Sequence, residues 1–141
     1  MPQTASKTKP IDRRLRVLIA DDHAVIRKRV RSILEQHPRL EIIGEAVDGL
    51  KAIEEAQRLE PDVVVMNVNM PGLNGLEAAR EINTKLPQSA IVILSLNADE
   101  RPIEEAKKIG ARAYVAKSKA AEALIKAIEA AIAGGDFVLM A

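Results

Sequence analysis

The sequence contains no cysteine and almost no aromatic residues. The missing cysteines exclude disulfide bonds and thiolate metal sites, and they agree with a reducing, cytoplasmic environment. Because aromatic residues make up only 1% of the chain, a core has to be assembled from Val, Ile, Leu and Ala, as in buried parallel sheets. No apolar run reaches membrane-spanning length, and the first ten residues, rich in Thr, Lys and Pro, do not resemble a signal peptide. We therefore expect a cytoplasmic protein that does not enter a membrane.

The chain also lacks an excess of charge of either sign. Lys and Arg number 21 and Asp and Glu number 20, which leaves a formal net charge of +1. Such a chain has no global field that would attract nucleic acid or an anionic membrane, so any DNA partner requires another domain. With 141 residues, of which 48% are hydrophobic, the chain has the size and composition of one soluble domain.

Short runs of Val, Ile and Leu alternate along the chain with longer segments of helical period. This alternation is typical of repeated βα units and predicts an α/β fold, a doubly wound five-stranded parallel sheet with helices on both faces. The predicted strands are Val17–Ala20, Glu41–Ala46, Val63–Val68, Ile91–Leu94 and Ala113–Ala116. The predicted helices are the segment Val25–Leu34, which ends before His37 and Pro38, and Gly49–Leu59, Leu76–Lys85, Glu100–Ile109 and Lys119–Ala133. We expect residues 1–14 to be a disordered tail and residues 15–134 to form the folded domain.

Polar residues follow the predicted strands at their carboxyl ends, the edge where ligands bind in open α/β sheets. They are Asp21, Asp22, Asn67, Ser95 and Lys117. Two adjacent carboxylates repel one another unless a cation lies nearby, so the acidic pair predicts a Mg²⁺ site. Lys117 would neutralise an anion, and the Ser95 hydroxyl would bond to an oxyanion. Taken singly, each residue also has a simpler interpretation: Asp22 as a helix cap, Lys117 as a surface lysine and Ser95 as a loop serine.

Five segments together resemble the receiver domains of two-component response regulators, over Arg16 to about Gly134. They are VLIADDHAVIRKRVRSILEQHP, IIGEAVDGLKAIE, PDVVVMNVNMPGLNG, IVILSLNADE and GARAYVAKS, in the family's order and spacing. The resemblance implies a flavodoxin-like, CheY-like sheet of strand order 2-1-3-4-5. Residues 15–134 would then be the receiver domain, and residues 135–141 the start of a linker or a C-terminal tail.

The resemblance also implies roles for the residues at the strand ends. Asp21, Asp22, Asn67 and the backbone carbonyl of Asn69 match the Mg²⁺ ligands, with Asp22 as the preferred direct ligand. Asn67 stands at the phosphoacceptor position, and Ser95 and Lys117 match the groups that contact the phosphate. Ser95 and Tyr114 match the conformational switch, although geometry alone favours a half-buried core position for Tyr114.

Asn67 is the main departure from the family, which has an aspartate at this position. Attack on a phosphoryl donor needs the carboxylate, so we expect phosphorylation to fail. One fewer carboxylate near the metal predicts weak or absent Mg²⁺ binding. Asn67 would be free to form a hydrogen bond with Lys117. We favour an engineered Asp-to-Asn change, because the other site residues remain suited to phosphate chemistry; the alternative is a naturally degenerate, phosphate-independent interaction module.

The segments ADDHAVIR and IIGEA, together with Ser95 and the pair Lys117 and Ser118, resemble the NarL/FixJ (LuxR-type) subfamily. That resemblance implies transcription regulation through a helix-turn-helix domain that this chain does not contain, so the chain is either a fragment ended at the domain boundary or a stand-alone receiver. The expected partners are a sensor histidine kinase or phosphotransfer protein, and an output DNA-binding domain or second receiver. The latter two would bind the face formed by the fourth helix, fifth strand and fifth helix, and we expect a monomer or weak dimer.

Two functions of other classes fit the sequence poorly. An aspartyl-phosphate hydrolase needs an Asp-x-Asp pair, and the corresponding residues here are Asn67, Val68 and Asn69. A flavodoxin-like carrier needs aromatic residues and a phosphate loop, which the sequence lacks. We therefore expect a signalling domain and not an enzyme.

Overall fold

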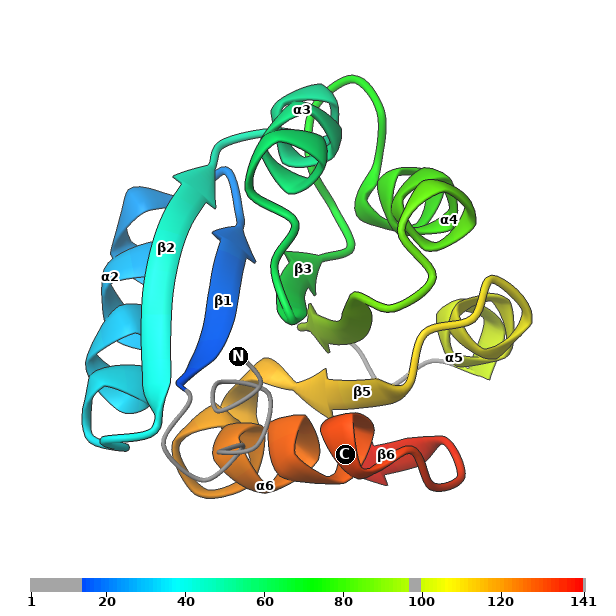
Figure 1. Ribbon diagram of the computed structural model, residues 1–141. Coiled ribbons are helices and arrows are strands. Elements are labelled where there is room, and N and C mark those ends of the chain that lie inside the picture. The colour runs from blue at the N-terminus through cyan, green and yellow to red at the C-terminus, as the bar shows by residue number, and fades with distance from the viewer. Residues whose placement is uncertain (1–13, 97–99, 141) are drawn as a thin grey trace, which may run out of the picture.

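The computed structural model describes residues 14–96 and 100–140 (Figure 1). The tail expected over residues 1–14 lies outside this part of the chain, apart from Arg14. The strands are β1 (Leu15–Ala20), β2 (Leu40–Ala46), β3 (Val63–Asn67), β4 (Ala90–Ser95), β5 (Ala113–Ala116) and β6 (Val138–Met140). The helices are α2 (Ala24–Glu35), α3 (Gly49–Leu59), α4 (Gly75–Lys85), α5 (Glu100–Lys108) and α6 (Ala120–Ala133), with a 3₁₀ turn at Lys117–Lys119. Within the described ranges, no helix is long and apolar enough to cross a membrane.

The six strands form one sheet of parallel strands in the order β2-β1-β3-β4-β5-β6. The predicted order 2-1-3-4-5 is therefore confirmed, with one additional strand at the β5 edge. All five predicted strands are present, and their observed ends differ from the predicted ones by at most two residues. This agreement follows from the strong apolar runs of a sheet that is buried on both faces.

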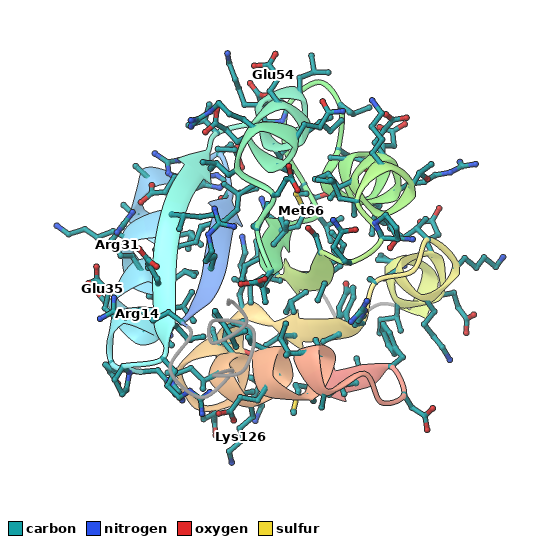
Figure 2. All side chains as sticks on the ribbon, viewed as in Figure 1. Arg14, Arg31, Glu35, Glu54, Met66 and Lys126 are labelled. Carbon is teal, nitrogen blue, oxygen red and sulfur yellow. The ribbon has the colours of Figure 1, made fainter. Side chains whose placement is uncertain are left out.

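Successive residues of each strand point to opposite faces of the sheet, and each face has its own apolar cluster. Val17 and Ile19 of β1 pack in the cluster beneath α2 and α6, whereas Leu18 and Ala20 pack in the cluster beneath α3, α4 and α5. Figure 1 shows these two helix layers on either side of the sheet. Met66 lies in the interior, whereas Arg31 and Glu35 on α2 point outward (Figure 2).

β6 was not predicted from the sequence. It lies within residues 135–141, where we expected a linker or tail, and pairs with β5 over Ala113 to Val115. The backbone N–H of Val138 donates to the carbonyl of Arg112 at 3.0 Å. Phe137, just before the strand, packs against the α3/α4/α5 cluster with the Lys107 ammonium 5.7 Å from its ring centre. β6 thus covers the edge of β5.

Candidate functional site

The polar residues predicted at strand ends lie at one edge of the sheet. They are Asp21 and Asp22 after β1, Asn67 at the end of β3, Ser95 at the end of β4 and Lys117 after β5. The register aligns these ends, because Asn67 pairs with Leu94 and Ser95 pairs with Ala116. Four of the five side chains are buried, and Asp22 is the exception. Buried polar groups of this kind have to be paired within the protein.

The Asn67 side-chain amide bridges two oxygen atoms. Its Nδ2 donates to Oδ1 of Asp22 at 3.2 Å and to the backbone carbonyl oxygen of Asn69 at 2.7 Å. A carbonyl and an ionised carboxylate can only accept, so the two contacts require the amide nitrogen, and not its oxygen, on this side. Both oxygens belong to residues that the sequence assigned to Mg²⁺. Asn67 therefore directs its two N–H donors at two of the expected metal ligands.

Lys117 pairs with Asp21 and not with Asn67. Its Nζ lies 3.2 Å from Oδ2 of Asp21, and the two side chains are only 9% and 3% exposed. Oδ2 is buried and has no partner with hydrogen-bond geometry, so its contact with Lys117 is an ion pair alone. The expected hydrogen bond between Asn67 and Lys117 is therefore wrong, because each residue has an acidic partner on its own side of the site.

The ring of His23 lies close to the carboxylates of both Asp21 and Asp22. His23 was not among the predicted site residues. Its ring Nδ1 is 3.3 Å from Oδ1 of Asp21 and 3.2 Å from Oδ1 of Asp22, and its backbone N–H donates to Asp21 at 2.8 Å. The only available signal in the sequence was its position directly after the acidic pair. His23 is also the N-cap residue of α2, and no side chain caps that helix. The alternative interpretation of Asp22 as the helix cap is therefore wrong.

Ser95 and Tyr114 are both buried, at 2% and 0% exposure. Ser95 ends β4 beside Ala116, which places its hydroxyl at the same edge as Asn67. Tyr114 belongs to the cluster under α3, α4 and α5. Its side chain is fully enclosed in this structure, which is more than the half-buried position considered from the sequence.

The loop after Asn67 is held by a glycine whose role the sequence analysis did not identify. A Cβ atom at Gly75 would overlap the backbone carbonyl of Asn67, and the Gly75 N–H donates to the Val68 carbonyl at 2.7 Å. The preceding Asn74 caps α4 in a capping box with Glu77, whose side chain accepts from the Asn74 backbone N–H. The start of α4 is thus fixed directly against the backbone that carries Asn67.

Two arginines of α2 attach that helix to the acidic edge. Arg27 donates to the backbone carbonyl of Asp21 at 2.8 Å and to Glu45 at 3.0 Å, and Arg31 donates to Glu45 at 2.6 Å. Partial burial acts to raise the pKa of Glu45, but the hydrogen bonds from Arg31 and Arg27 outweigh it and hold that pKa below 4.5. The same ion pair raises the pKa of Arg31.

The sequence profile of the response regulator receiver domain matches residues 17–129. The chain belongs to this family. NarL of Escherichia coli strain K12, a nitrate/nitrite response regulator, is 36% identical over 118 residues, which are 84% of this chain and 55% of NarL. The crystal structure of a LuxR-family two-component response regulator from Aurantimonas has a TM-score of 0.84 and 32% identity, with 89% of each chain covered. The predicted likeness to the NarL and LuxR type is confirmed.

One relative of this receiver domain is an enzyme. The protein-glutamate methylesterase/protein-glutamine glutaminase of Alkalilimnicola ehrlichii is 39% identical over 105 residues, which make up 74% of this chain but 27% of the enzyme. That similarity is confined to the enzyme's receiver domain, so it implies no methylesterase activity here. More generally, the chain spans about half the length of the first curated relatives that it matches.

Receiver domains bind Mg²⁺ at an acidic cluster, and this domain has one. Asp21, Asp22 and His23 offer ligand atoms that all lie within 4.8 Å of one another. The carboxylates suit a hard divalent cation, and the buried Oδ2 of Asp21 has no hydrogen bond to lose. The Asn67 amide does not fit, because its N–H groups point at Asp22 and at the Asn69 carbonyl. The acidic pair therefore fits a cation, and the third position, as it is oriented, does not.

Proposed function

We propose that this receiver domain is the input module of a transcription regulator of the LuxR/NarL type, and that with Asn67 it does not accept phosphate. The observation that carries the proposal is Asn67 at the end of β3, in the phosphoacceptor position between Asp22 and the Asn69 carbonyl. The named relatives are response regulators that are longer than this chain, because the matched residues make up only 54% and 55% of their lengths, and this agrees with an output domain in the whole protein.

The chemistry follows from the change of carboxylate to amide. An aspartate attacks a phosphoryl donor with a carboxylate oxygen and becomes an acyl phosphate. An amide oxygen is a far weaker nucleophile, and Asn67 turns its N–H groups toward the metal-ligand oxygens. Lys117, the group proposed to contact a phosphate, is already paired with Asp21. The domain would then remain in its unphosphorylated arrangement.

Exposed apolar side chains support the docking of a partner at this edge. The described residues expose six large hydrophobic side chains, and four of them lie where strands or turns lead into helices at the carboxyl edge of the sheet. The four are Val25, Val47, Leu50 and Leu96. Response regulators interact with histidine kinases, and we propose a histidine kinase or phosphotransfer protein as the partner here.

Mass spectrometry after incubation with acetyl phosphate and Mg²⁺ tests the proposal. We expect no mass increase for the chain with Asn67, and one added phosphoryl group for the Asn67→Asp variant. Hydroxylamine should remove that group, because it cleaves an acyl phosphate and leaves a phosphoserine intact. The matched control is Asn67→Asp combined with Lys117→Ala, which retains the nucleophile without the lysine and should gain phosphate more slowly.

Two outcomes would contradict the proposal. A hydroxylamine-sensitive mass increase on the chain with Asn67 would mean that another carboxylate accepts phosphate. Failure of Asn67→Asp to gain phosphate, with its fold intact by circular dichroism, would mean that the site no longer supports the reaction. The second result would favour a phosphate-independent interaction module.

A further inference from the structure

We infer that the Asn67 amide takes the place of the divalent cation in this domain, so that the acidic edge is complete without Mg²⁺. In receiver domains the cation neutralises an acidic cluster. Here the side-chain nitrogen of Asn67 lies 3.2 Å from a carboxylate oxygen of Asp22 and 2.7 Å from the carbonyl oxygen of Asn69. One donor group therefore holds together two oxygens that a bound cation would otherwise hold.

Both carboxylate oxygens of Asp21 also have positive or N–H partners. Oδ1 of Asp21 accepts the His23 backbone N–H at 2.8 Å, and Oδ2 lies 3.2 Å from the Lys117 ammonium. Oδ1 of Asp22 faces the His23 ring in addition to Asn67. The Lys117 ammonium thus balances one of the two carboxylate charges, and the uncharged Asn67 amide donates to the other carboxylate, so groups of the protein itself reduce the repulsion that usually calls for a metal.

For a cation to bind, Asn67 has to turn its amide over. Its oxygen would then face the cation, and both hydrogen bonds of Nδ2 would be lost from a side chain that is only 4% exposed. Losing two such bonds weakens Mg²⁺ binding by at least about tenfold relative to a site without the amide. This explanation of weak Mg²⁺ binding differs from one based on the missing carboxylate, because it predicts that removal of the Asn67 amide alone allows Mg²⁺ to bind. It also does not depend on whether the domain accepts phosphate.

Thermal unfolding with a chelator and with millimolar Mg²⁺ distinguishes the two explanations of weak Mg²⁺ binding, the hydrogen-bonded amide and the missing carboxylate. We expect the midpoint of the chain with Asn67 to be the same in both conditions. Asn67→Ala, which has neither the amide nor a carboxylate, should unfold at a lower temperature with chelator and be stabilised by Mg²⁺. Asn67→Asp should behave in the same way with a larger response. The matched control is Gln57→Glu, an amide-to-acid change at an exposed position of α3, which should leave the Mg²⁺ response at zero.

A direct readout covers the case in which Asn67→Ala does not fold. The side-chain NH₂ resonances of Asn67 in the unaltered chain should stay unchanged as Mg²⁺ is added, because the amide remains bonded to Asp22 and Asn69. A saturable shift of these resonances would overturn the inference. So would a Mg²⁺ response that appears in Asn67→Asp but not in folded Asn67→Ala, because the carboxylate alone would then account for binding.

Discussion

Asn67 places a hydrogen-bond donor inside a group of oxygens. A carboxylate there would face Asp22 and the Asn69 carbonyl with like charge or like dipole, whereas the amide bonds to both. As a result, a side chain of the protein relieves part of the repulsion between the oxygens gathered at this edge. Lys117 contributes on the other side, where it faces Asp21 in a nearly dry environment.

The buried pair of Lys117 and Asp21 is expected to be sensitive to the loss of one partner. Lys117→Met leaves the Asp21 carboxylate buried without its counter-charge, so the free energy of unfolding should fall by about 3–5 kcal/mol. Urea unfolding of the unaltered chain and of Lys117→Met measures this difference in the free energy of unfolding. The double variant Asp21→Asn with Lys117→Met removes both charges and should lose less than the single variant. Equal losses in the two would show that the pairing itself contributes nothing.

Among the elements, α2 is the helix whose attachment to the site depends on charge. It has no side-chain cap at its start and no acidic residue in its first turn. Arg27 and Arg31 instead fasten it to Glu45 of β2, and Arg27 also reaches the carbonyl of Asp21. The position of His23 at the head of α2 thus depends on ion pairs one and two turns further along the helix.

Replacing Glu45 should therefore cost stability that depends on pH. The pKa of Glu45 is lower in the folded protein than its ordinary 4.5, so its stabilisation is fully present above that value and is lost as the pH falls through the folded pKa. At neutral pH, Glu45→Gln should lose about 0.5–1 kcal/mol, and the loss should shrink in acid. Urea unfolding at neutral and acid pH checks this. Glu41→Gln, at another exposed position of the same strand, is the control, and a loss that is independent of pH would contradict the ion-pair explanation.

The elements also show where sequence interpretation succeeds and where it stops. β3 and β4 could be predicted because every residue in them is buried, which produces unbroken apolar runs. β6 could not be predicted, because a strand of only three residues beyond Gly134 and Gly135 shows no hydrophobic period. Its formation depends on pairing with β5, which is distant in the sequence. The strand-end rule placed Asn67 and Lys117 at one edge. It could not supply their partners, because these depend on side-chain orientations that no spacing encodes.

For the whole molecule, the face formed by α5, β5 and α6 is the predicted contact surface, and it includes the predicted fourth and fifth helices. Four alanines of α6 are buried and therefore not available to a partner: Ala120, Ala123, Ala127 and Ala131. They pack in the cluster with β5. β6 covers the edge of β5 between these helices, so a partner would meet β6 before β5.

We accordingly expect the isolated chain to be monomeric or weakly associated. If Asn67 does not accept phosphate, as proposed, only differential affinity of a partner for two conformations could shift the domain. Light scattering across a concentration series, with and without beryllium fluoride, should give a mass that remains close to that of one chain. A tight dimer whose interface excludes α5, β5 and α6 would rule out the predicted surface.

The presence of β6 also bears on aggregation. Without it, β5 would be the last strand of the sheet, and its four buried residues would present an apolar edge with unpaired backbone groups. Such edges recruit strands from other molecules. The open edge is instead a strand of three residues, preceded by two glycines, Asp136 and Phe137. A short edge of this kind offers few positions for a foreign strand, so β6 would protect the sheet against fibril-like association during storage or overexpression.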